Sequence, residues 1–125
     1  MIRLTKHTVM AMQSDLIDRT GGEHGLRDEG LLESALELPF ISFFGLDPYP
    51  SVIAKAARLA FGLTRNHAFV DGNKRIGILV MISFLRLNDM LIKATDEELI
   101  ELGLSIANKA YDINDISRWI KRHRI

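Results

Sequence analysis

The residues best suited to chemistry lie together in one short segment near the middle of the chain. His67 offers a base, Asp71 a carboxylate, and Lys74 with Arg75 two cations. Gly72 permits a tight turn among them, because glycine reaches backbone conformations closed to other residues. A long apolar stretch follows at once. This arrangement is typical of a site that holds a phosphorylated ligand and activates a hydroxyl group beside it.

His67, Phe69 and Asp71 each admit a specific role. His67 falls where a helix is expected to end, and its imidazole suits removal of a proton from a hydroxyl, although a histidine there often only complements the helix dipole. Phe69 is expected to bury itself and anchor the loop. Asp71 precedes a helix and fits an N-cap, but it is also a hard oxygen ligand that can hold Mg²⁺ against phosphate oxygens.

The residues from Gly72 to Arg75 predict an anion site. Gly72, Asn73 and Lys74 can turn successive N–H groups inward at a helix N-terminus, where the helix dipole already favours anions. Lys74 and Arg75 fall in the first turn of that helix, where cations oppose the dipole. We therefore expect a bound phosphate group to neutralise them, with Arg75 as a bidentate grip.

Turn signals and apolar periodicity divide the chain into helices. The first predicted helix is capped by Thr5 and ended by Gly21-Gly22, and a brief second helix over 31–38 is ended by Pro39. The third is capped by Ser51 and ends near Asn66-His67, and the fourth covers 74–87. The fifth begins with a capping box of Thr95 and Glu98 and runs to about Ala110, and the sixth covers 114–121. Residues 25–30 are expected to form a turn, and residues 40–50 an aromatic loop or irregular hairpin. No strand alternation is present, so the predicted class is all-α.

Composition narrows the class of protein. The 125 residues are expected to form a single domain over 1–125, and the absence of cysteine excludes disulfides and thiol catalysis and fits a cytoplasmic location. Sixteen acidic residues balance sixteen basic ones, so no global field attracts nucleic acid or an anionic membrane. The start lacks the apolar region of a secretory signal. The longest apolar run, Ile76 to Leu85, is half of the roughly twenty residues that span a bilayer.

The central segment, His67-Ala68-Phe69-Val70-Asp71-Gly72-Asn73-Lys74-Arg75, resembles the signature of Fic-domain proteins, His-x-Phe-x-(Asp/Glu)-Gly-Asn-(Gly/Lys)-Arg. Lysine at the eighth place, together with residues 25–36, resembles the Doc (death-on-curing) branch, the toxins of Phd/Doc-type toxin–antitoxin pairs. The resemblance covers nearly the whole chain. It implies an all-α fold of about six helices with the motif loop between two central helices.

The resemblance also assigns roles to the motif residues. It implies His67 as the general base, Phe69 as the loop anchor, Asp71 as the Mg²⁺ ligand, Gly72, Asn73 and Lys74 as the lining of an anion hole, and Arg75 as the grip on a phosphate. ATP is the implied co-substrate. The acceptor would be a serine or threonine hydroxyl of a target protein.

Two departures from the wider family bear on the reaction. Most Fic adenylyltransferases have glycine in place of Lys74 and a second arginine in place of Ile78, where it holds the terminal phosphates. In the Doc branch this pattern goes with transfer of the γ-phosphate, which makes the toxin a protein kinase. The implied target is elongation factor Tu and the consequence is arrest of translation. Transfer of AMP by the same residues is the alternative.

The resemblance implies a partner as well. The chain shows no inhibitory Ser/Thr-x-x-x-Glu helix, so control would fall to a Phd-like antitoxin that binds a groove on the toxin. The faces of the first two helices and the loop Phe40–Phe44 are the expected contacts.

Two other classes compete with a transferase. A ribonuclease toxin would use His67 with Lys74 and Arg75, but neutral charge and the lack of an aromatic–basic stripe count against it. A binding module would hold a phosphorylated ligand without turnover. A zinc hydrolase is disfavoured, because the four histidines, His7, His24, His67 and His123, show no ligand spacing.

Overall fold

The computed structural model describes residues 1–125, and all of its regular secondary structure is helical. In chain order the elements are α1 (Lys6–Thr20), α2 (Glu29–Glu37), the short 3-10 helix η1 (Leu38–Phe40), α3 (Val52–Asn66), α4 (Asn73–Leu87), α5 (Asp96–Ala107) and α6 (Ile113–His123). Only isolated β-bridges are present, and no strand. The all-α prediction is confirmed. No helix has the length and apolar character needed to cross a membrane.

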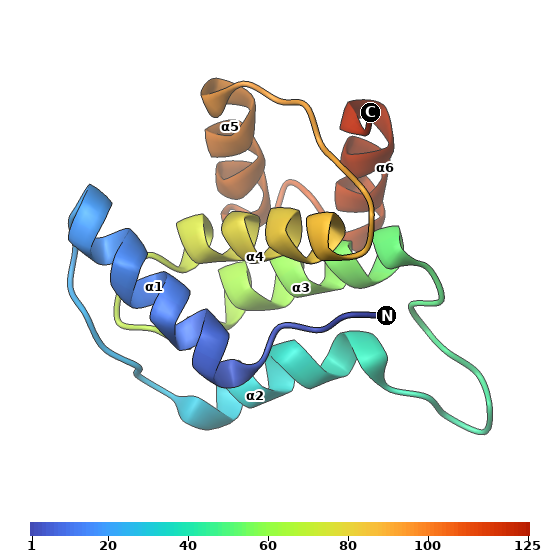
Figure 1. The fold of residues 1–125 in the computed structure, drawn as a ribbon, viewed down its shortest axis with the longest axis horizontal. Helices are drawn as coiled ribbons and strands as arrows, with labels where there is room; N and C mark the ends of the chain where they lie inside the picture. Colours follow the sequence, from blue (N-terminus) through green and yellow to red (C-terminus); the bar gives the residue numbers. More distant parts are fainter.

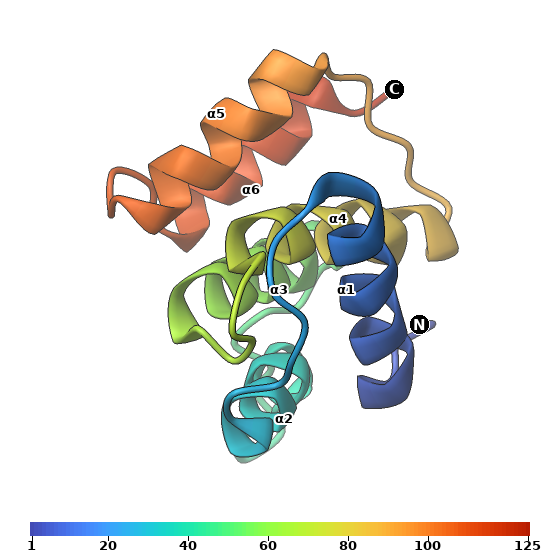
Figure 2. The same ribbon diagram turned by 90° about the vertical axis from the view of Figure 1, so that its left-hand side faces the viewer.

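Helices α3 and α4 form the centre of the molecule (Figure 1). On one side α1 packs on α4 and α2 packs on α3, and on the other side α5 packs on α4 and α6 on α3 (Figures 1 and 2). The loop that joins α3 to α4 carries the motif, so the predicted placement between two central helices is confirmed. Both ends of this loop are therefore anchored in the core.

Small residues let the two central helices approach each other closely. The alanines of α3 at positions 56, 57 and 60 are fully buried. On α4, a Cβ added to Gly77 would lie 2.3 Å from Oγ1 of Thr64 and 3.2 Å from the carbonyl oxygen of Ala60. Because no side chain larger than hydrogen fits there, Gly77 sets the distance between α3 and α4 just behind the motif.

Five of the six α-helices begin with a side-chain cap, and α4 does not. The capping residues are Thr5, Asp28, Ser51, Thr95 and Asp112. Helix α4 instead follows Gly72, which is left-handed with φ +78° and offers no side-chain acceptor. The interpretation of Asp71 as an N-cap is wrong, because Asp71 lies one residue before the N-cap. Its Oδ1 accepts a hydrogen bond from the backbone N–H of Gly72.

Two predicted boundaries were wrong. The turn expected over 25–30 ends early, because Asp28 caps α2 by accepting from the N–H of Leu31, and Glu29 and Gly30 are already helical. Helix α5 ends at Ala107 instead of about residue 110. There Lys109 adopts a left-handed backbone, with φ 69°, which interrupts the helical path.

The segment between η1 and α3 is an irregular hairpin, as predicted, closed by a bridge between Phe43 and Leu46. The side chain of Lys55 on α3 is buried and joins the two ends of this hairpin. Its Nζ donates to the carbonyl oxygen of Pro39 at 3.1 Å, to Oδ2 of Asp47 at 2.7 Å and to the carbonyl oxygen of Tyr49. Phe43 and Phe44 at the tip remain exposed.

Candidate functional site

The motif loop is closed by the side chain of Asn73. Its Oδ1 accepts from the N–H of Phe69 at 3.1 Å, and its Nδ2 donates to the carbonyl oxygen of Phe69 at 3.0 Å. Phe69 itself is 2% exposed and packs in the core. The amide of Asn73 therefore serves the loop, and only its backbone N–H can serve an anion.

The segment between α1 and α2 pairs with the motif loop. The N–H of Val70 donates to the carbonyl oxygen of Gly25 at 3.0 Å, and the N–H of Arg27 donates to that of Ala68 at 2.8 Å. The Arg27 side chain also donates through Nε to the carbonyl oxygen of His67 at 2.7 Å. These bonds hold the loop from its outer side, so its backbone is set by contacts distant in sequence.

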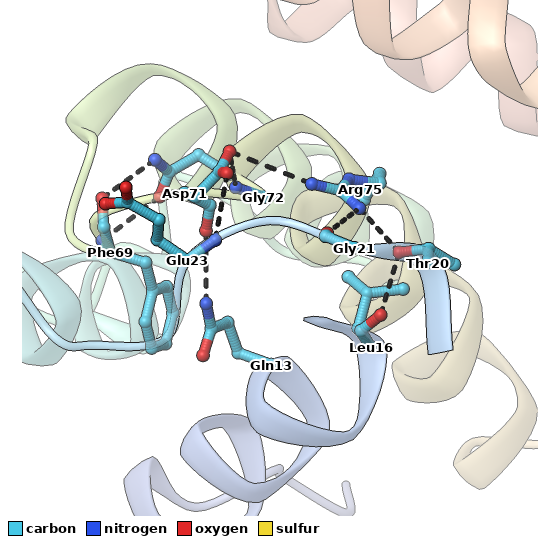
Figure 3. Close-up of polar contacts among 10 residues, drawn as sticks. Gln13, Leu16, Thr20, Gly21, Glu23, Phe69, Asp71, Gly72 and Arg75 are labelled. Carbon is cyan, nitrogen blue, oxygen red and sulfur yellow. Dashed lines mark hydrogen bonds and ion pairs between the residues drawn. The ribbon is translucent and has the colours of Figure 1, made fainter. Parts of the chain in front are cut away.

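Asp71 lies where a carboxylate is stabilised in its charged form. Its Oδ1 accepts from the N–H of Gly72 at 2.8 Å and its Oδ2 from the N–H of Glu23 at 3.2 Å (Figure 3). These two hydrogen bonds, and then the nearby charges of Arg75 and Lys74, hold the pKa of Asp71 below its ordinary value of 3.8. Asp71 is therefore ionised at neutral pH.

Arg75 reaches from α4 to the end of α1. Its Nη1 donates to Oγ1 of Thr20 and, at 3.0 Å, to the carbonyl oxygen of Gly21, while Nη2 lies 3.7 Å from Oδ1 of Asp71 (Figure 3). The C-terminus of a helix favours a cation, so α1 stabilises the charge of Arg75. A bound phosphate is therefore not required to offset the charge of Arg75. It is still expected for Lys74, which is exposed and forms no ion pair.

His67 ends α3 in a left-handed conformation, with φ 53° and ψ 46°. The residue is exposed, and its ring forms no hydrogen bond within the protein. A left-handed backbone costs a non-glycine residue about 1 kcal/mol. The bond from Arg27 to the His67 carbonyl oxygen helps to hold this conformation. The imidazole is thus left free to meet a ligand.

These residues share one cavity of about 410 Å³. Its lining combines the predicted residues His67, Asp71, Gly72, Asn73, Lys74 and Arg75 with Thr64, Val70 and Ala107. Of the predicted site residues, only Phe69 lies outside the lining, in the core. The backbone N–H groups at positions 73, 74 and 75 have no partner within the protein, so the start of α4 presents free donors beside a base, a carboxylate and two cations.

An apolar groove of about 490 Å³ adjoins this cavity, and the part that α4 and α5 play in it was not predicted. It lies between α1, α4 and α5 and shares Lys74 and Arg75 with the cavity. Its apolar lining consists of Leu16, Ile78, Leu79, Ile82, Leu99, Ile100 and Leu104. No local sequence signal identifies it, because one of its three walls, α1, lies far from α4 and α5 in the chain.

A buried contact from α1, which was not predicted from the sequence, also supports the motif loop. Gln13 is 3% exposed, and its Nε2 donates to the carbonyl oxygen of Asp71 at 3.1 Å (Figure 3). A signal was available, since Gln13 stands midway between Val9 and Ile17 on the buried stripe of α1. A polar residue in such a stripe indicates a buried hydrogen-bond partner. Thr20 and Glu23 offered no comparable signal.

The donor set at Asp71 fits Mg²⁺ only together with phosphate oxygens. No group of three or more histidine, cysteine, aspartate and glutamate side chains is placed to hold a metal ion. Asp71 supplies one ionised carboxylate, and each of its oxygens retains a lone pair beyond the bonds to Gly72 and Glu23. Mg²⁺ is commonly bound by one or two carboxylates and substrate phosphates, so the donor set would suit a metal ion that is also bound by phosphate oxygens.

Comparison with known proteins agrees with this geometry. The Fic/DOC family model matches residues 3–85, and the chain belongs to that family. Among curated proteins, "Toxin Doc" of Mycolicibacterium smegmatis is 45% identical over 74 residues, which cover 59% of this chain and 57% of the relative. The match thus spans somewhat more than half of that protein.

Proposed function

We propose that this chain is the toxin of a toxin–antitoxin pair and acts as a Mg²⁺-dependent phosphotransferase. It would transfer the γ-phosphate of ATP to a serine or threonine hydroxyl of a protein, with a translation factor such as elongation factor Tu as the target. The name of the similar mycobacterial protein supports the toxin role. The observation that carries the chemistry is the uncapped start of α4 beside a free histidine.

In this proposal each residue acts through a contact that its position allows. The free N–H groups at the start of α4 and the Lys74 ammonium bind phosphate oxygens, and Arg75 supplies the guanidinium N–H groups not engaged by α1. His67, whose ring is free, accepts the proton of the target hydroxyl. Asp71 would hold Mg²⁺, which neutralises phosphate charge when it is bound.

Phosphate transfer is favoured over AMP transfer by the residues at two positions. Lys74 adds a side chain and a charge where most adenylyltransferases have glycine. Ile78 is 7% exposed, so an apolar side chain stands where those enzymes carry the arginine that holds the terminal phosphates. A nucleotide bound as in the adenylyltransferases would therefore lack the arginine contact to its terminal phosphates.

The decisive experiment labels the transferred group. Purified protein is incubated with cell lysate, Mg²⁺ and ATP labelled at either the α or the γ phosphate, beside a His67→Ala variant and a His7→Ala control outside the site. We expect a protein band labelled from γ alone, lost in His67→Ala and kept in His7→Ala. Label from α would establish AMP transfer instead. No His67-dependent band from either label would refute a transferase and favour a nuclease or a binding module.

The antitoxin is proposed to occupy the apolar groove beside α1. An amphipathic helix laid along Leu16, Ile100 and Leu104 would bury exposed apolar surface and cover Arg75 at the end of the groove. The exposed tip formed by Phe43 and Phe44 is a second proposed contact. The test compares neutralisation by a Phd-like antitoxin in cells.

We expect Leu104→Asp to abolish neutralisation and Phe44→Ser to weaken it. If neutralisation and affinity are unchanged in both variants, neither surface binds the antitoxin.

A further inference from the structure

The hydroxyl group of Thr20 links α1 to Arg75 on α4, the residue proposed to bind phosphate. Thr20 is the last residue of α1, and its Oγ1 donates to the carbonyl oxygen of Leu16 at 2.7 Å. The same oxygen accepts from Nη1 of Arg75 on α4 (Figure 3). A hydroxyl has a single proton, so the bond to Leu16 leaves lone pairs directed toward the guanidinium. The orientation of this hydroxyl is therefore set by α1.

The contact divides the donors of Arg75 into two sets. Nη1 is engaged by Thr20 and by the carbonyl oxygen of Gly21, and Nη2 lies 3.7 Å from Oδ1 of Asp71. A guanidinium has five N–H donors in a rigid plane, so holding Nη1 fixes the direction of the others. Arg75 is only partly exposed and lines the cavity beside Gly72 and Lys74. The remaining donors are thereby presented to a ligand without a search among side-chain rotamers.

We infer that Thr20 is a positioning residue, whose hydroxyl holds the Arg75 guanidinium in the orientation that binds phosphate. This inference rests on the phosphate site proposed above. Ordering an arginine side chain costs conformational entropy. Because Thr20 already restricts Arg75 in the ligand-free protein, less of this entropy is lost when the ligand binds. Gly21 contributes through its carbonyl oxygen, which any residue would supply, so the side-chain contribution is that of Thr20 alone.

The test compares Thr20→Val, which keeps the shape of the side chain and removes the hydroxyl, with Thr20→Ser, which keeps the hydroxyl. Binding of inorganic pyrophosphate with Mg²⁺ is measured by calorimetry, so the result depends on neither the target protein nor turnover. We expect Thr20→Val to raise the dissociation constant about three- to tenfold, the range for one lost hydrogen bond. Thr20→Ser should stay within about twofold of the wild type.

A second measurement follows Arg75 directly. The Nε–Hε resonance of Arg75 in the ligand-free protein should show faster motion in Thr20→Val and wild-type behaviour in Thr20→Ser. In an Arg75→Lys background, Thr20→Val should have no further effect on pyrophosphate binding. Melting temperatures of all variants establish that the fold is retained.

The outcomes separate the two proposals. The role of Thr20 would be overturned if Thr20→Val bound pyrophosphate as tightly as the wild type, or if Thr20→Val and Thr20→Ser lost the same amount of affinity. Either result would leave the proposed phosphate site standing. Absence of pyrophosphate binding by the wild type would refute the phosphate site and this inference with it.

Discussion

The substitution Gly77→Ala should strain the packing between the two central helices and lower the free energy of unfolding. The added Cβ would lie 2.3 Å from Oγ1 of Thr64, with Ala60 O at 3.2 Å and the N–H nitrogen of Thr64 at 3.3 Å. Extra atoms in a packed core cost about 1–3 kcal/mol, and alanine gains about 1 kcal/mol over glycine in a helix. Because the closest approach is far below contact distance, the cost should exceed the gain. We expect a net loss of about 1–2 kcal/mol in the free energy of unfolding.

The neighbour of Gly77 makes this prediction specific. Thr64 is 1% exposed, and its Oγ1 has no hydrogen-bond partner, so Thr64→Ala removes the clashing atom without breaking a hydrogen bond. In a Thr64→Ala background the added methyl would meet only the contacts at 3.2 and 3.3 Å. Gly77→Ala should then be nearly neutral. The coupling between the two substitutions should be about 1–2 kcal/mol, as for residues in direct contact.

Urea unfolding followed by circular dichroism measures all four combinations of these substitutions. Gly103→Ala in α5 is the matched control, because a Cβ there would meet its nearest neighbour, Ile78, at an ordinary 3.6 Å. It should be neutral or stabilising. An equal cost of Gly77→Ala in both backgrounds would show that the close approach of position 77 to Oγ1 of Thr64 is not the source of that cost. An unchanged stability in Gly77→Ala alone would refute the expected strain.

Three further results are expected. Asn73→Ala should lower the free energy of unfolding by about 2–4 kcal/mol, because the N–H and carbonyl groups of Phe69 lose their partners in a buried site; a loss below 1 kcal/mol in urea unfolding would contradict this. Lys55→Met should cost about 1–3 kcal/mol and speed thermolysin cleavage near Phe43 and Phe44, and an unchanged cleavage rate would show that the hairpin is held by other contacts. The free energy of unfolding should fall as the pH drops below about 4. Carboxylates whose pKa is lower in the folded state stabilise the fold only while they are ionised. Hydrogen bonds and ion pairs lower the pKa in this way for Glu29, Asp47, Asp71, Glu98 and Asp115. Melting temperatures from pH 7 to pH 2 measure this trend, and a flat profile would contradict it.

The elements that could be predicted from the sequence are those whose signals are local. Thr5, Ser51 and Thr95 each cap a helix by accepting from an N–H three residues later, and all three helix starts were predicted correctly. The placement of the chemical residues in a loop before a helix was also local, since Gly72 directly precedes the apolar run of α4.

Contacts between distant segments could not be predicted in this way. The partner of Arg75 is a hydroxyl 55 residues earlier in the chain, and the contact exists only because α1 packs on α4 with its end toward the motif. The apolar groove depends in the same way on the packing of three helices. A first-turn arginine looks misplaced when a helix is considered alone, and the neighbouring helix end changes that judgement.

The uncapped start of α4 connects ligand binding to the folding equilibrium of the protein. An anion that accepts from the free N–H groups at positions 73–75 would complete this helix as Thr5 or Ser51 completes its own. A ligand that binds only the folded state, present at a hundred times its dissociation constant, stabilises that state by about 2.7 kcal/mol. Candidate nucleotides can therefore be ranked by the rise in melting temperature that each produces. If the proposed function is correct, such a ranking would show which nucleotide the site binds most tightly.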